Sequence, residues 1–212
     1  GGQKPAVAFI PYGIPGSTKE KDFRAEGKTF LTANADVETA RKLLAEAGFP
    51  GGKGFPKISY KYNMNPLNKS IAEALQAMWK QNLGVEVELV NQEWKVFIDT
   101  RIQKDYDIAR HAYLVDFFDA GSLLELWLTG TYENVTGYAN PEYDRLVKET
   151  MREMDHAKRI GYFHQAEELL MNDAVVLPIY FYATPYLQNP RVKGIYISPR
   201  NWDFFRVADV AN

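Results

Sequence analysis

One stretch of the sequence, residues 58–115, determines the fold: ISYKYNMNPLNKSIAEALQAMWKQNLGVEVELVNQEWKVFIDTRIQKDYDIARHAYLV. Alternation of apolar and polar residues predicts three strands, at 58–62, 85–89 and about 106–115. Apolar residues at helical spacing predict two helices between them, at 71–83 and 94–102. Strand, helix, strand, helix, strand with short joints is typical of a parallel sheet with crossover helices. The sequence therefore predicts an α/β domain whose sheet is mixed, mostly parallel and flanked by helices.

Further elements are predicted on both sides of this stretch. Asp36 is a suitable cap for a helix that ends at Gly48. Asn140-Pro141 opens a helix with Tyr143, Leu146, Val147 and Met154 on one side, and a second helix follows around 160–170. The apolar run 174–182 predicts a buried strand, in which Pro178 favours an edge or a bulge. Residues 1–33 show little periodicity and contain several Pro and Gly, so we expect an irregular lead-in that rests on other structure.

Composition excludes several classes of protein. The 212 residues are 46% hydrophobic and 25% charged, which is enough apolar material for a sizeable core and argues against disorder. Lys+Arg number 25 and Asp+Glu 27, so the net charge of -2 argues against a broad nucleic-acid surface. No run of 18 apolar residues is present, and cysteine is absent, which removes disulfides and thiolate sites. The opening Gly1-Gly2-Gln3-Lys4-Pro5 lacks an initiating Met, which predicts a segment cut from a longer protein.

The carboxyl ends of the predicted strands indicate where a ligand would bind. Open α/β sheets bind ligands in the crevice beyond these ends. Asn68, Trp94 and Asp116 follow the three strands, so we expect them along one rim, where an amide, a large aromatic ring and a carboxylate suit an organic ligand with a cationic group. On spacing alone, a capping Asn, a core Trp and a loop Asp explain these residues equally well.

Two arginines and a histidine in the same stretch have competing interpretations. Arg110 lies on the third strand among apolar neighbours, which predicts a carboxylate partner or a ligand, because an unpaired charge there is costly. Arg101 lies seven residues after Trp94 on the same side of the helix, where a solvated surface arginine is the default. His111 is more typical of a packed or hydrogen-bonded histidine than of a metal ligand.

No catalytic or metal constellation stands out. Asp116 and Asp119 have the residue types of a glycosidase carboxylate pair, but a spacing of three is common and also suits a helix cap. The three histidines lack the spacing of a metal site, and no nucleotide-binding or serine-hydrolase motif occurs. We therefore expect neither an enzyme, nor a metal, nor a cofactor.

Specific segments of the chain resemble peptide-binding components of bacterial ABC importers, the family 5 solute-binding proteins. The segments that carry the resemblance are ARKLLAEAG (40–48), 71–83 followed by GVEVEL (84–89), NQEWKVF (91–97), YDIAR (106–110), NPEYD (140–144) and AVVLPIYFY (174–182). The family fold is a periplasmic-binding-protein-like lobe of the class II type, one of two main lobes that close around ligand. The resemblance implies a C-terminal lobe with three segments: 1–33 between lobes, 34–184 as the ligand-binding lobe, and 185–212 returning toward a missing N-terminal lobe.

The resemblance also assigns roles to individual residues. Asp116 matches the acidic residue that meets the α-amino group of a bound peptide. Other positions match residues that line the peptide site: Trp94, Arg101, Arg110, Tyr182, Asn68, Tyr113 and Leu114.

The resulting hypothesis is a substrate-binding component of an ABC importer that binds oligopeptides through their α-amino group and backbone. Its implied partners are the permease subunits, and its implied location is periplasmic or extracytoplasmic, with a lipid anchor on the parent protein as one form. Two alternatives remain: the same fold with a dipeptide, cell-wall peptide, sugar, nickel chelate or haem as ligand, and a signalling or chaperone-like module without transport.

Overall fold

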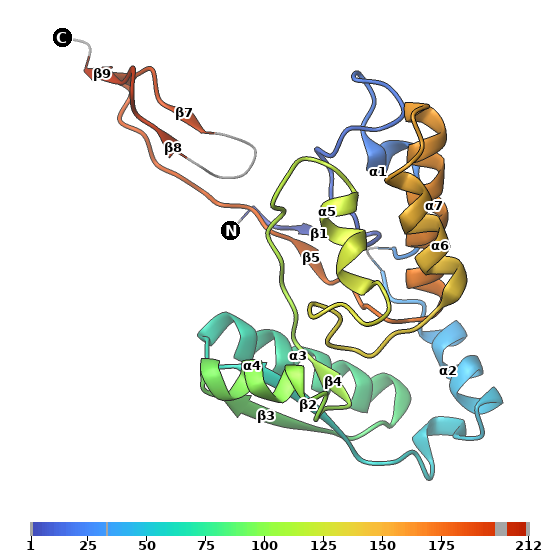
Figure 1. Cartoon of the computed structure of the whole chain (residues 1–212). Helices are drawn as coiled ribbons and strands as arrows, with labels where there is room; N and C mark the ends of the chain where they lie inside the picture. Colours follow the sequence, from blue (N-terminus) through green and yellow to red (C-terminus); the bar gives the residue numbers. More distant parts are fainter. Residues whose placement is uncertain (1, 33, 198–202, 211–212) are drawn as a thin grey trace. The chain divides into compact units, whose positions relative to one another are not determined.

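The computed structural model describes residues 2–32, 34–197 and 203–210. Its contacts divide the chain into two compact units (Figure 1). Unit 1 comprises residues 1–33, 113–134 and 138–212, and unit 2 comprises residues 34–112 and 135–137. The segment 34–184, predicted as one lobe, is thus divided between both units. No helix in the described part of the chain is long and apolar enough to cross a membrane.

Unit 2 contains the predicted parallel sheet. Its three strands are β2 (Ile58–Asn63), β3 (Val87–Gln92) and β4 (Ile108–Ala109). The central strand β2 pairs in parallel with β3 from Ile58 opposite Val87, and with β4 from Tyr60 opposite Ile108. This arrangement confirms the α/β prediction for the stretch that determines the fold.

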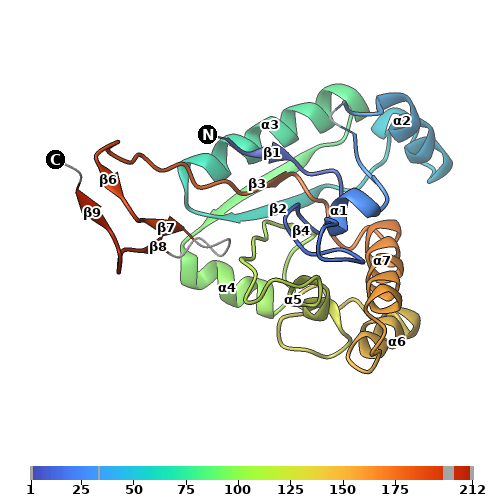
Figure 2. The same cartoon turned by 90° about the horizontal axis from the view of Figure 1, so that it is seen from above.

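The two crossover helices lie on either side of this sheet (Figure 2). They are α3 (Pro66–Leu83) and α4 (Trp94–Ile102). Because β2 lies between β3 and β4, the two crossovers run in opposite directions, and right-handed connections then place their helices on opposite faces. Tyr60, Tyr62 and Val87 are buried toward α3, with Ala72 at the centre of this small core.

Polar side chains fix the starts of two helices in unit 2, and the sequence predicts this role for Asp36. The carboxylate of Asp36 accepts a hydrogen bond from the backbone N–H of Thr39 at the start of α2 (Val37–Glu46). The Asn65 side chain accepts bonds from the first turn of α3, and Pro66 occupies its first position. A short 3-10 helix, η1 (Pro50–Gly52), follows α2.

Gly84 ends α3 in a left-handed conformation, with a φ angle of 71°. A Cβ atom there would lie 2.3 Å from the carbonyl oxygen of Gly51, which is backbone and cannot rotate away. Gly48, after α2, has a φ of 93° but open space around the position of its missing Cβ. The two glycines therefore share the same conformational requirement and differ in crowding.

We expect Gly84→Ala to lower the free energy of unfolding by more than about 1 kcal/mol, since an L residue is strained at positive φ and the new methyl group collides with η1. Gly48→Ala is the matched control, because it carries the conformational cost without the collision. Urea unfolding of both variants measures the difference. Equal losses would show that the contact with Gly51 has no energetic weight.

Unit 1 is built on two helices that lie side by side, α6 (Pro141–Thr150) and α7 (His156–Asn172) (Figure 1). Three short helical segments pack with them: α1 (Phe23–Glu26), α5 (Gly121–Leu124) and η2 (Glu125–Trp127). The predicted apolar face of α7 is buried, at Ile160, Phe163, Ala166 and Leu170.

The irregular N-terminal segment contributes to the same core. Ile10, Ile14 and Phe23 are fully or almost fully buried in it. Arg24 is also buried, and its Nη1 lies 2.5 Å from Oε1 of Glu167, with each side chain only 1% exposed. The same carboxylate oxygen accepts a hydrogen bond of 2.8 Å from the backbone N–H of Ile10. The segment that was expected to rest on other structure is thus held by apolar burial and by a buried ion pair.

The remaining strands of unit 1 are two residues long and antiparallel. β1 (Lys4–Pro5) pairs with β5 (Tyr180–Phe181), β6 (Val192–Lys193) with β9 (Asp209–Val210), and β7 (Tyr196–Ile197) with β8 (Asp203–Phe204). The prediction of a buried strand over 174–182 is wrong, because only β5 forms there and Leu177 and Ile179 are exposed. One further backbone bond joins Ala6 to Ile179 at 3.1 Å, and Pro178 interrupts the run beyond it, since a proline has no N–H to donate.

Two other predicted elements differ in length from the structure. The strand predicted over 106–115 is limited to β4, because the chain leaves the edge of β2 after the backbone N–H of Arg110 bonds to the Lys61 carbonyl at 2.9 Å. The helix predicted to include Met154 ends at Thr150. Met154 lies in the turn before α7 and is exposed, which its apolar character did not indicate.

Candidate functional site

Two predicted residues of unit 2 lie at the carboxyl ends of its strands. Asn68 is buried in the first turns of α3, and its amide Nδ2 donates to Oδ1 of Asn63 at 3.0 Å, at the end of β2. Trp94 begins α4 directly after β3, and its side chain is 50% exposed. Both positions agree with the rule for open α/β sheets. An exposed Trp94 also excludes the interpretation of a core tryptophan.

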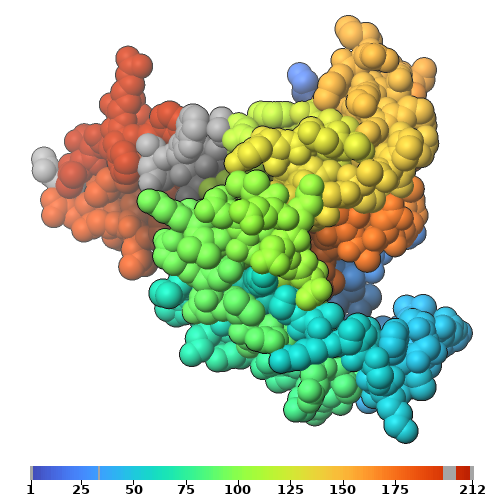
Figure 3. All heavy atoms as spheres, turned by 60° about the horizontal axis from the view of Figure 1, so that its bottom comes forward, coloured from blue at the N-terminus to red at the C-terminus, as the bar shows by residue number. Residues whose placement is uncertain are grey.

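Arg101 lies two helical turns after Trp94 on α4, which is drawn in green at the surface in Figure 3. Its guanidinium carbon is 5.7 Å from the ring centre of the buried Phe97. Its Nη2 is 2.9 Å from Nδ1 of His111. Burial lowers the pKa of Arg101 from its ordinary value. The interpretation of Arg101 as a solvated surface arginine is therefore wrong.

Arg101, Arg110 and His111 form a group in unit 2, called the cationic group below because of its two arginines. Nη1 of Arg110 is 3.4 Å from Oδ1 of Asn63, so one of its partners is an amide. The pKa of His111 falls to about 4, because burial disfavours its charged form and because Arg101 and Arg110 repel a further positive charge. His111 is a hydrogen-bonded histidine, as predicted. This group presents two arginine charges around a neutral imidazole.

Asp116 belongs to unit 1, where Tyr113 and Ser122 contact it. The Tyr113 hydroxyl donates to the Asp116 carboxylate, and this hydrogen bond raises the pKa of Tyr113 to about 12. The backbone N–H of Asp116 donates to Oγ of Ser122 at 2.9 Å. Asp116 is exposed, and the Tyr113 hydroxyl engages one of its two carboxylate oxygens. Leu114, two residues earlier, is 74% exposed.

Asp116 and Tyr113 line a hollow of about 270 Å³ within unit 1. The remaining residues of its wall are Phe117, Ser122, Glu125, Leu126, Leu128, Thr131 and Glu133. Burial and the neighbouring Asp119 raise the pKa of Glu125. The wall residues after Asp116 follow no strand end and no simple period, so the sequence analysis missed them.

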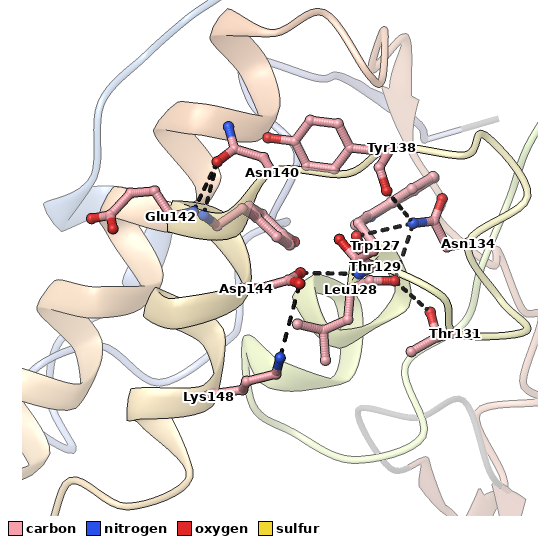
Figure 4. A network of polar contacts seen from close by, with 11 residues as sticks. Trp127, Leu128, Thr129, Thr131, Asn134, Tyr138, Asn140, Glu142, Asp144 and Lys148 are labelled. Carbon is pink, nitrogen blue, oxygen red and sulfur yellow. Dashed lines mark hydrogen bonds and ion pairs between the residues drawn. The ribbon is translucent and has the colours of Figure 1, made fainter.

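A buried asparagine, Asn134, holds the loop that carries the wall residues Leu128 and Thr131 (Figure 4). Nδ2 of Asn134 donates to the carbonyl oxygens of Trp127, Leu128 and Tyr138 at 3.2, 3.1 and 2.8 Å. Thr131 donates to the Leu128 carbonyl at 3.0 Å, within the same loop. Together with the bond of 3.0 Å from the backbone N–H of Thr129 to the carboxylate of Asp144 on α6, these bonds fix a backbone that is irregular after η2.

Asp119 is engaged in a structural role. Its two carboxylate oxygens form a bidentate pair with Arg159 on α7 at 2.6 and 2.8 Å, and Oδ1 also accepts from the backbone N–H of Gly121. A carboxylate held in this way is a poor general acid or nucleophile, which argues against the glycosidase alternative. Within the described residues, no group of three or more His, Cys, Asp or Glu is arranged to hold a metal ion.

The predicted site residues are thus distributed over both units. Unit 2 holds Asn68, Trp94, Arg101 and Arg110, and unit 1 holds Tyr113, Leu114, Asp116 and Tyr182. Tyr182 is half exposed and packs edge-on against Tyr180, with ring centres 5.2 Å apart. That all eight line one peptide site stays a prediction, as does the common rim of Asn68, Trp94 and Asp116.

Comparison with known proteins gives a consistent result. Residues 1–134 match the family described as bacterial extracellular solute-binding proteins, family 5 Middle. The dipeptide-binding protein DppE of Bacillus subtilis is 40% identical over 211 residues, covering 98% of this chain and 38% of the relative. The periplasmic oligopeptide-binding protein OppA of Escherichia coli is 40% identical over 157 residues, covering 74% of this chain and 29% of the relative.

Solved structures agree. Haemophilus influenzae OppA, in complex with RPPGFSPFR, matches with a TM-score of 0.81 and 32% identity over 100% of this chain and 41% of that chain. The substrate-binding domain of an oligopeptide ABC transporter from Bacillus anthracis matches with a TM-score of 0.83 and 28% identity, over 100% and 41%. The chain therefore spans well under half of the length of these relatives. A family of solute-binding proteins also explains the lack of catalytic motifs in the sequence. The chain belongs to the family 5 bacterial extracellular solute-binding proteins.

Proposed function

We propose that this chain is the C-terminal lobe of a substrate-binding component of an ABC importer, and that it binds oligopeptides. The observation that carries the proposal is Asp116, an accessible carboxylate at the wall of a hollow, oriented by Tyr113 and Ser122. A free ammonium is common to all unmodified peptides, so a carboxylate that binds it recognises a peptide without reading its sequence.

The cationic group in unit 2 supports the same class of ligand. A peptide carries one carboxylate in addition to its ammonium, and guanidinium groups suit carboxylates because of their paired donors. Arg101 and Arg110 supply two such groups, with Asn68 and Trp94 in the same unit. In the proposal, Tyr113, Leu114, Tyr182 and Trp94 provide apolar surface for side chains of many kinds.

The proposed parent protein includes an N-terminal lobe that closes the second side of the peptide site. Relatives named as peptide-binding proteins are longer than this chain, which covers 38% of DppE. The permease subunits of the importer are the proposed protein partners. The parent acts outside the cytoplasmic membrane, either free in a periplasm or tethered by a lipid anchor.

Native mass spectrometry of the full-length protein, purified without refolding, tests the ligand class. We expect mass additions that fragment into a mixture of short peptides. A single adduct would indicate one dedicated ligand instead, such as the murein tripeptide named for MppA, a relative that is 35% identical over 195 residues. A metal chelate or a sugar would overturn the peptide proposal.

Calorimetry with matched ligands tests the role of the ammonium. We expect N-acetylation of a bound peptide to weaken its affinity at least tenfold, because the acetylated nitrogen carries no charge for Asp116 to bind. C-terminal amidation of the same peptide tests the cationic group in the same way. Equal affinities for free and acetylated peptides would contradict the proposed contact.

A further inference from the structure

His111 contacts a ligand-binding candidate without belonging to the predicted ligand-binding set. We propose that His111 is a positioning residue, whose neutral imidazole orients the Arg101 guanidinium toward an anionic group of the ligand. The inference rests on the proposed function, because it assumes that Arg101 meets the ligand. It adds His111 to the residues that shape the proposed site, specifies the tautomer of its ring, and gives a reason why a histidine suits this position.

The contact between Arg101 and His111 fixes the tautomer of the imidazole. Nη2 of Arg101 lies 2.9 Å from Nδ1 of His111, a distance typical of a hydrogen bond. A guanidinium nitrogen can only donate, so Nδ1 must be the acceptor and carries no proton. In the neutral ring the proton is therefore on Nε2.

This hydrogen bond is the main directional restraint on Arg101 within its unit. The Phe97 ring supports one face of the guanidinium, with a distance of 5.7 Å, but does not fix its rotation in the plane. Nε of Arg101 is buried and has no hydrogen-bond partner among the described residues. The titratable groups that act on the Arg101 charge are Tyr106 and Arg110, and no carboxylate among the described residues forms an ion pair with it.

A neutral acceptor suits this position better than a carboxylate. A carboxylate would orient the guanidinium but cancel its charge, which would weaken the attraction for an anionic ligand group. The imidazole stays uncharged because it is largely buried and faces Arg101 and Arg110, while the nearby Tyr106 is occupied by its bond to the Val135 carbonyl at 2.6 Å. The pKa of His111, about 4, keeps the imidazole neutral near pH 7.

Two-dimensional ¹⁵N NMR of the full-length protein tests the tautomer independently of any ligand. We expect the His111 resonances of a neutral ring with a protonated Nε2 and an unprotonated Nδ1, unchanged between pH 8 and pH 5. A protonated Nδ1, or titration near the ordinary pKa of histidine, would overturn the inference.

Three variants then test the use of this contact in binding. His111→Leu removes the acceptor, His111→Asn keeps an oxygen near the position of Nδ1, and His111→Gln moves it toward the position of Nε2. We expect His111→Leu and His111→Gln to weaken binding of a peptide with a free carboxylate about tenfold, the value of a hydrogen bond to a charged group, and His111→Asn to restore most of the affinity. Circular dichroism confirms that each variant is folded.

An amidated peptide and an Arg101→Met background separate positioning from a general structural effect. We expect His111→Leu to change the affinity for the amidated peptide less than twofold. In the Arg101→Met protein, we expect His111→Leu to lower the affinity for the free peptide by a further factor of less than two. Equal losses of affinity for the free and the amidated peptide would overturn the positioning role of His111 but not the proposed function. Losses that multiply when His111→Leu and Arg101→Met are combined would do the same. A wild-type protein that binds neither peptide would overturn the proposed function.

Discussion

Glu167→Ala is expected to lower the free energy of unfolding by about 3–5 kcal/mol, because it leaves the Arg24 guanidinium charged and buried without a partner. It also leaves the backbone N–H of Ile10 without its acceptor. The guanidinium keeps a bond of 2.6 Å from its Nη2 to the Lys28 carbonyl and lies 5.9 Å from the ring centre of Phe23, and neither contact supplies a compensating charge. Chemical denaturation measures the loss.

The adjacent residue provides a matched control. Glu168 forms an ion pair with Lys28 at 2.6 Å, but both side chains are about half exposed. Both pairs thus join the same N-terminal segment to the same helix and differ mainly in burial. We expect Glu168→Ala to cost less than about 1 kcal/mol, as exposed pairs generally do. Similar losses for the two variants would refute the importance of burial.

A double substitution distinguishes the energy of the pair from the penalty of a lone charge. In Arg24→Met/Glu167→Leu, both charges are replaced by apolar side chains of similar size. We expect this protein to be more stable than either single variant, because replacement of a buried pair by apolar residues is often neutral. A double variant as unstable as Glu167→Ala would instead indicate that the hydrogen bond to Ile10 dominates.

Asp116→Ala in the full-length protein is expected to weaken peptide affinity at least tenfold. The substitution removes the negative charge that a peptide ammonium would pair with. It also removes the carboxylate that accepts the hydrogen bond from the Tyr113 hydroxyl. In a closed site that excludes water, loss of one partner of such a pair costs several kcal/mol. Isothermal titration calorimetry with one defined peptide measures the change.

Three controls accompany the Asp116 substitution. Asp116→Asn keeps the shape and a hydrogen-bond acceptor but removes the charge, and we expect nearly the same loss. Glu168→Ala removes one carboxylate from the surface of α7 and should leave peptide affinity unchanged. N-acetylated peptide should bind Asp116→Ala about as well as unmodified peptide does. Unchanged affinity of Asp116→Ala would remove this residue from the proposed site.

The sequence predicted the elements that depend on local patterns. The parallel sheet of unit 2 follows from alternation over residues 58–62 and 85–89 with a helix between them, and the cap Asp36 follows from side-chain chemistry. The predicted strand length was wrong where an apolar run had no neighbouring strand along most of its length, as in 174–182. Apolar character predicts burial, but hydrogen-bonded pairing depends on what lies alongside.

Features that join distant residues were not predictable. Arg24 and Glu167 lie 143 residues apart, and no local pattern distinguishes their pair from the exposed pair of Lys28 and Glu168. The wall of the hollow beyond Asp116 depends on a loop held by Asn134, whose role is visible only when its three carbonyl partners are known. Arg101 was expected in solvent because its helix position does not show the hydrogen bond to His111, which lies beyond the helix.

The burial of the N-terminal segment also sets the order in which the chain can complete its folding. Ile10 meets its hydrogen-bond partner Glu167 across 157 residues, whereas the core of unit 2 closes within residues 44–108. At a synthesis rate of about 5–20 residues per second, Ile10, Ile14 and Phe23 wait roughly 8–30 s for α7 to emerge. Unit 2 therefore has time to fold first, while the apolar N-terminal segment remains a target for chaperones until the last helix of its own core is made.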